Sequence, residues 1–307
     1  MMTKSSKEIR DNNNIKLNVS YAIVGIVVIA SFTAATALFL LHNTVPSFEY
    51  LAFAQEEGDE TVADTTNTNT NTTTNVANLT SSNTTKLVDF VSNIEQIRGH
   101  LEQAISNKQA GNNILVLAHT LHPIEEIYSN IEGQISDANS TLNQTLSSNL
   151  NQLSQMANNS TPDQFNMQVQ KVNGLLNQTV EKVVPIENRN NDTVAFNLVI
   201  VADLLATAET EYKEAVENGT IKEIVEYQDA QGFVSRAQSI FEQTLPAMKP
   251  QELSGKIQNV KEFFSELNNT IDNKSNPEVI NTSIRAIIHE ISGITGIREE
   301  SLLSSLN

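Results

Sequence analysis

Apolar residues recur every three or four positions through most of this chain from Lys86 onward, and this spacing sets the fold class. In the first such stretch the apolar positions are Leu87, Phe90, Val91, Ile94, Ile97, Leu101 and Ile105. Residues at these intervals share one face of an α-helix, and that face can be buried against other helices. The same region has no sustained alternation of apolar and polar residues, which strands would require. The sequence therefore predicts an all-α fold.

The predicted helices fall into two sets of four. The first set comprises a helix from residue 86, one over 112–135, one over 142–156 and one that begins at Thr161 and Pro162. The second set comprises 194–218 with Gly219 as its C-cap, 223–245, 252–271 and a last helix from residue 278. Segments 158–172 and 272–286 share a polar turn, a proline and a helix start, as in a divergent repeat. We predict two tandem up-and-down four-helix bundles, at residues 86–187 and 188–307.

Residues 21–41 form an uncharged apolar stretch that is long enough to cross a bilayer as a helix. Basic residues precede this stretch and acidic residues follow it, so we expect residues 1–20 to be cytoplasmic and the rest to lie outside a cell membrane. The alternative is a signal segment cleaved after Ala54, which would give a secreted protein. Residues 42–85 are acidic and then rich in Thr and Asn, which predicts a flexible linker.

Asn-x-Ser/Thr sequons after this apolar stretch number 13, about twice the chance expectation for such a composition. They indicate a glycosylated surface protein. Together with the lack of cysteine, they would suit an archaeal cell surface.

The charge and the residue types exclude several functions. A formal net charge of −17 argues against a nucleic-acid partner, because binding phosphates needs basic surface. The chain has no cysteine, so disulfides, thiolate metal sites and cysteine nucleophiles are excluded. No complete catalytic motif is present, and we expect a protein that is not an enzyme.

Three of the five histidines lie in the first two predicted helices. If the second helix continues through Pro123, then His119, His122 and Glu126 share one face, and His100 on the neighbouring helix could add a ligand. Imidazole and carboxylate together suit iron, zinc or copper. In the alternative reading Pro123 begins a new helix, where His122 is only a capping residue and the acids only favour the first turn.

A second candidate cluster is the acidic segment AETEYKEAVENG. Glu211 and Glu214 are three residues apart on one predicted helix, and carboxylates that face the interior of a bundle can bind a metal ion. The alternative is that this run is the solvated face of an acidic protein.

Residues 211–238, EYKEAVENGTIKEIVEYQDAQGFVSRAQ, resemble the extracytoplasmic helical segment of Ftr-type iron permeases. The matching residues are Glu211, Tyr212, Glu214, Val216, Asn218, Gly219, Glu226, Tyr227 and Asp229. Residues 97–104 and 118–128 are similar to the first half of such a domain, so the resemblance extends over about 86–245. The membrane helices of the permeases, with their Arg-Glu-x-x-Glu motifs, are missing from this chain.

The segment TLHPIEEIY is also similar to the G-x-H-x-x-E motif of imelysin-like iron-uptake proteins. His122 and Glu125 match its histidine and glutamate, whereas Thr120 replaces the glycine. Both resemblances imply a surface domain that binds or delivers iron or a related metal. With the predicted membrane segment and the clustered histidines, the leading hypothesis is a tethered domain that binds iron, or copper or zinc, and delivers it to an iron permease or another envelope protein. The alternative function is a glycosylated structural or interaction protein of the cell surface that binds no metal.

Overall fold

The computed structural model describes residues 82–186, 188 and 193–303. The predicted membrane segment, most of the linker and three of the 13 sequons lie outside these residues. Within the described ranges, no helix has the length and apolarity needed to cross a bilayer. Among the described residues the first helix begins at Ser82, inside the last residues of the segment predicted as a linker.

The described part of the chain is helical almost throughout, which confirms the predicted all-α fold. The first half contains α2 (Ser82–Gln109), α3 (Asn113–His122), a π-helical turn η1 (Pro123–Ile127), α4 (Tyr128–Asn159) and α5 (Pro162–Val183). The second half contains α7 (Thr193–Ala215), α8 (Ile224–Thr244), a 3-10 turn η2 (Leu245–Ala247), α9 (Pro250–Asp272), α10 (Pro277–Thr295) and α11 (Glu299–Leu303).

Local sequence signals set the ends of these helices. Thr161 caps α5 through a reciprocal capping box with Gln164, and Pro162 occupies the first turn as predicted. Asn276 caps α10 by accepting a hydrogen bond from the Glu278 N–H, and a proline follows it. This agrees with the polar turn, proline and helix start predicted for residues 272–286. Within α4 the backbone breaks at Asn139, whose side chain accepts a hydrogen bond from the Leu142 N–H and so starts a new helical segment.

The segment predicted as the C-terminal end of the 194–218 helix is instead a short hairpin. Helix α7 stops at Ala215, and strands β1 (Val216–Glu217) and β2 (Thr220–Ile221) pair antiparallel. Asn218 and Gly219 between them both have positive φ, which is the conformation of a type I′ hairpin turn. Asn-Gly is the usual sequence for this turn, so Gly219 is a turn residue and not a helix cap.

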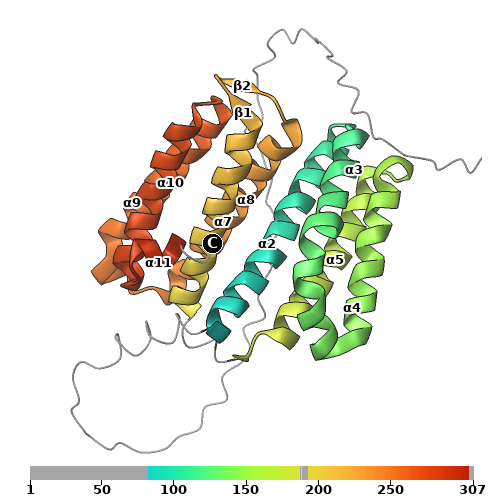
Figure 1. Cartoon of the computed structure of the whole chain (residues 1–307), viewed down its shortest axis with the longest axis horizontal. Helices are drawn as coiled ribbons and strands as arrows, with labels where there is room; N and C mark the ends of the chain where they lie inside the picture. The colour runs from blue at the N-terminus through green and yellow to red at the C-terminus, as the bar shows by residue number, and fades with distance from the viewer. Residues whose placement is uncertain (1–81, 187, 189–192, 304–307) are drawn as a thin grey trace, which may run out of the picture. The chain divides into compact units, whose positions relative to one another are not determined.

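Helix α2 packs against helices of both halves of the chain (Figure 1). It contacts α3 and α5 on one side and α7 and α8 on the other, while α9 packs mainly on α10. The described residues all belong to one compact unit, and buried side chains from both halves belong to one core cluster. Helices α2 and α8 are therefore the elements that can bring residues of the two halves together.

The crossing of α2 and α8 depends on two glycines. A Cβ added to Gly232 would lie 2.8 Å from the Gly99 carbonyl oxygen, and one added to Gly99 would lie 2.8 Å from the Phe233 ring. These distances are shorter than any ordinary contact, so only glycine lets the two backbones approach this closely. His100 follows Gly99 directly, and Asp229 lies one turn before Gly232.

Asp203 of α7 is an acid buried at the interface with α2, with 6% of its surface exposed. Burial raises the pKa of Asp203 to about 6, the nearby charge of Asp89 adds to this, and the Ser92 hydroxyl offers only a poorly aligned hydrogen bond. Above pH 6 the folded protein must therefore keep a carboxylate out of water, which costs stability.

We expect Asp203→Asn to raise the free energy of unfolding by roughly 2–3 kcal/mol at pH 8, since each unit of pKa shift is worth about 1.4 kcal/mol. The gain should shrink as the pH falls from 6 to 4, because the folded wild-type protein then takes up the proton. Urea denaturation at pH 8, 6 and 4 measures this, with Asp137→Asn on the exposed face of α4 as the control. A gain that is the same at all three pH values would contradict the explanation.

Candidate metal centre

Three histidine side chains surround one carboxylate in the interior of the described region. The Nδ1 atoms of His100 and His119 lie 2.6 and 2.9 Å from Asp229 Oδ1. The Nδ1 atom of His122 lies 3.2 Å from Asp229 Oδ2. His100 comes from α2, His119 and His122 from α3, and Asp229 from α8, so three helices contribute to the cluster. We call these four residues the histidine–aspartate cluster.

The backbone of α3 and η1 explains how two of the histidines reach this position. His119 and His122 are one helical turn apart and therefore share a face. Pro123 has no N–H and cannot continue the ordinary hydrogen-bond ladder, and the chain passes through a π-helical turn closed by the Tyr128 N–H and the Pro123 carbonyl. The helical path thus continues through Pro123, which is the alternative that places His119 and His122 on one face. His122 makes no side-chain capping hydrogen bond, so the alternative in which it only caps a new helix is wrong.

The electrostatics of the cluster are dominated by Asp229, which is 1% exposed. Burial alone would raise the pKa of Asp229, but its contacts with the three imidazoles hold it well below its usual range. The hydrogen bond to Asp229 raises the pKa of His122 to about 9 against the effect of burial. Burial lowers the pKa of His100 despite the same carboxylate. At neutral pH the cluster therefore contains a carboxylate, a charged His122 and a neutral His100.

His100 is the least satisfied member of the cluster. Its side chain is almost fully buried, and its Nδ1 makes no hydrogen bond of acceptable angle even though Asp229 is near. Its ring also stands edge-on to Phe233, with 5.1 Å between the ring centres. A nitrogen atom held in place without a hydrogen bond is available as a ligand. Ligand atoms of His100, His122 and Asp229 all lie within 4.8 Å of one another.

The four acidic residues predicted as ligands differ in exposure and in how near they lie to the histidine–aspartate cluster. Glu126 lies beside the cluster, with its Oε2 3.9 Å from His122 Nδ1, but its side chain is 60% exposed. Glu211 is half-buried, and burial together with the charges of Asp229 and Glu226 raises the pKa of Glu211 to about 7. Glu125 and Glu214 are exposed side chains. Glu126 and Glu211 are thus neighbours of the cluster, while Glu125 and Glu214 are not drawn into it.

Asp229 was missing from the predicted ligands, although it stood among the residues that carried the permease resemblance. It is 110 residues from His119 in the sequence. The helical spacing of α8 places it on the buried face with Phe233, and that pattern could have indicated an acid in the core. Its partner histidines could not be deduced without knowing that α8 crosses α2.

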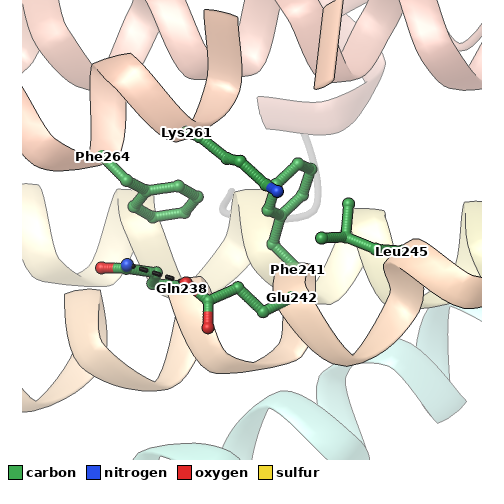
Figure 2. A pocket seen from close by; sticks show the side chains of 6 residues that line it. All are labelled: Gln238, Phe241, Glu242, Leu245, Lys261 and Phe264. Atoms are coloured by element: carbon green, nitrogen blue, oxygen red, sulfur yellow. Dashed lines mark hydrogen bonds between the residues drawn. The ribbon is translucent and has the colours of Figure 1, made fainter. Parts of the chain in front are cut away.

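A separate pocket lies between α8 and α9 (Figure 2). Its lining residues are Gln238, Phe241, Glu242, Leu245, Lys261 and Phe264. None of them belongs to the histidine–aspartate cluster, and the pocket has no histidine or paired carboxylates. The candidate metal ligands therefore lie elsewhere.

Residues 187–298 match the family model of the iron permease-associated 4-helix bundle domain. The match contains the segment 211–238 and confirms the resemblance drawn from it, but it extends over α7 to α10 and does not include residues 86–186. It associates this part of the chain with iron uptake. No curated protein and no solved structure matches the chain. Of the cluster, Asp229 lies within the matched residues and the three histidines lie before them.

Proposed function

We propose that this protein binds a first-row transition metal ion, which we take to be iron, at His100, His119, His122 and Asp229. The observation that supports this most is the convergence of three imidazole Nδ1 atoms on one buried carboxylate. Hydrogen bonds alone leave one of these atoms without a partner. Neutral imidazoles could donate Nδ1–H to the carboxylate without adding charge, but His100 Nδ1 makes no hydrogen bond of acceptable angle although Asp229 Oδ1 lies 2.6 Å away.

A metal ion removes this difficulty because neutral imidazoles can bind it through their lone pairs while the carboxylate offsets its charge. Histidine and carboxylate ligands are typical of Fe(II), and also of zinc and copper. The choice of iron rests on the match of residues 187–298 to an iron permease-associated domain.

The carboxylates beside the cluster could attract a cation to it by their negative charge. Glu126 is exposed next to His122, and Glu211 and Glu226 are less exposed carboxyl groups close enough to Asp229 for their charges to interact. We propose that they attract the metal ion toward the cluster and that the protein passes it to an iron permease.

The remaining features complete the proposal. We propose a glycosylated protein, tethered outside the membrane by residues 21–41 or released after Ala54, with its helices arranged as tandem four-helix bundles. Its role would be metal capture and delivery, without an enzymatic reaction.

A metal titration of the untagged full chain tests the proposal. We expect about one equivalent of Fe(II) to bind under anaerobic conditions, and the affinity to fall at least about 100-fold in the His119→Ala, His122→Ala double variant, because two ligands are lost. His289→Ala is the matched control, since His289 is exposed on α10 and pairs with Glu299. If the wild-type chain binds no iron, zinc or copper, the surface-interaction function replaces this proposal.

A further inference from the structure

One carboxylate oxygen of Glu226 in α8 has no partner in the described part of the chain. This atom, Oε2, is shielded from solvent and accepts no hydrogen bond. By contrast, both oxygens of the largely buried Glu95 are paired, Oε1 at 3.1 Å from Arg98 Nε and Oε2 at 2.6 Å from Arg236 Nη2. A charged oxygen that is out of water and unpaired is costly, so Glu226 Oε2 is a candidate ligand for a cation.

The sequence position of Glu226 places it beside the histidine–aspartate cluster. Glu226 and Asp229 are three residues apart on α8 and therefore share a face of the helix. Burial raises the pKa of Glu226, the charge of His122 opposes this rise and the charge of Asp229 adds to it, so all three groups lie within electrostatic reach. An acid in the first turn of a helix is favourable in itself, but this does not explain an oxygen held away from water without a partner.

Two unpartnered atoms thus lie beside the same carboxylate, that of Asp229. Four residues of the described ranges have a buried side-chain atom without a hydrogen bond, and His100 Nδ1 and Glu226 Oε2 are two of these atoms. Imidazole nitrogen and carboxylate oxygen are both ligands of first-row transition metals. His100 comes from α2 and Glu226 from α8, so two separate helices bring an unused ligand atom to this place.

The charge of the proposed ion gives a reason for a second carboxylate. Fe(II) carries two positive charges, and three neutral imidazoles offset neither of them. With Asp229 alone, one net positive charge would remain among side chains that are mostly buried, and such a charge is costly. The carboxylate of Glu226 would make the site neutral.

We infer that Glu226 is a further ligand of the metal ion and binds it through Oε2, beyond the attraction proposed above. This inference rests on the proposed function, because Glu226 can be a ligand only if the cluster binds a metal. In the structure its oxygens lie outside the group of ligand atoms, from His100, His122 and Asp229, that are within 4.8 Å of one another. A glutamate side chain has three rotatable bonds, which let the carboxylate turn toward a bound ion.

Glu226→Gln tests this role because it keeps the shape of the side chain and removes the charge. We expect the affinity for Fe(II), measured by anaerobic titration of the full chain, to fall at least about 100-fold, since even a residue that only orients a ligand is worth about 10- to 100-fold. Glu126→Gln is the matched control, because Glu126 Oε2 lies 3.9 Å from His122 Nδ1 but the side chain is 60% exposed. The control should cost about 5-fold or less, as is usual for a solvated charge.

Two further measurements separate a ligand from a charge that only attracts the ion. Salt screens exposed charges far more than buried ones, so the loss in Glu226→Gln should persist between about 0.05 and about 0.5 M NaCl, whereas any loss in Glu126→Gln should shrink. Glu226→Asp keeps the charge but is shorter by one methylene group. It should still lower the affinity about 10-fold or more, because a ligand must reach the ion.

The same titrations distinguish this inference from the proposed function. Equal and salt-sensitive losses in Glu226→Gln and Glu126→Gln, or wild-type affinity in Glu226→Asp, would overturn the assignment of Glu226 as a ligand. The proposed function would then still stand if the His119→Ala, His122→Ala double variant loses iron. A wild-type chain that binds no metal would refute the proposed function and this inference with it.

Discussion

Asp229→Asn should lower the affinity of the protein for Fe(II) by about 100-fold or more, although it changes only one atom of a side chain. Asp229 is the acid shared by all three histidines, and the amide of asparagine has neither the charge nor the ligand strength of a carboxylate. Loss of a residue that merely orients a ligand costs about 10- to 100-fold, so loss of a direct ligand should cost at least the upper value. Isothermal titration under anaerobic conditions measures the change.

The matched control is Asp203→Asn, which removes another buried acid of the same compact unit. The charges and hydrogen bonds that shift the pKa of Asp203 come from Ser92 and Asp89, and no histidine is among them. This variant should bind iron as the wild-type protein does. Equal losses in the two variants would indicate a general effect of buried charge, and an unchanged affinity in Asp229→Asn would exclude Asp229 as a ligand.

Gly232→Ala should destabilise the fold and weaken metal binding together. The new methyl group would lie 2.8 Å from the Gly99 carbonyl oxygen, so α2 and α8 must separate. Overpacking of this kind costs about 1–3 kcal/mol, which exceeds the gain of roughly 1 kcal/mol that alanine brings to a helix. Because His100 follows Gly99 and Asp229 lies one turn before Gly232, the same movement draws His100 away from the carboxylate.

Gly174→Ala provides the comparison for this change. Gly174 lies in α5, and a Cβ there would meet no atom within 4 Å. The substitution should therefore leave iron binding unchanged and raise the free energy of unfolding by up to about 1 kcal/mol. Thermal and urea unfolding, with iron titration of both variants, checks the pair. A Gly232→Ala protein as stable as Gly174→Ala would contradict the proposed close contact of α2 and α8.

The helices and the three clustered histidines could be predicted from the sequence because their signals are local. Three- and four-residue spacing identified the buried faces, and Thr161 with Pro162 marked a helix start. The spacing of His119 and His122 showed that they share a face if the helix continues past Pro123.

Features that depend on contacts between distant segments were not predictable in this way. The approach of Gly99 to Gly232 puts His100 beside Asp229, and neither glycine signals its partner in the sequence. The hydrogen bond from Asn107 to Gln228 likewise joins residues 121 positions apart. The hairpin at Asn218–Gly219 is a different case, because its turn sequence was visible and was read as a helix cap.

The location of bound iron is the most direct test of the central claim that these three histidines and Asp229 form a metal site. A crystal structure of the iron-loaded protein, with an anomalous difference map recorded at the iron absorption edge, measures it. We predict one peak at about 2.0–2.2 Å from Nδ1 of the histidines and from an Asp229 oxygen. A peak only at exposed carboxylates such as Glu125 and Glu214, or iron-loaded protein with no peak among the three histidines, would contradict the claim.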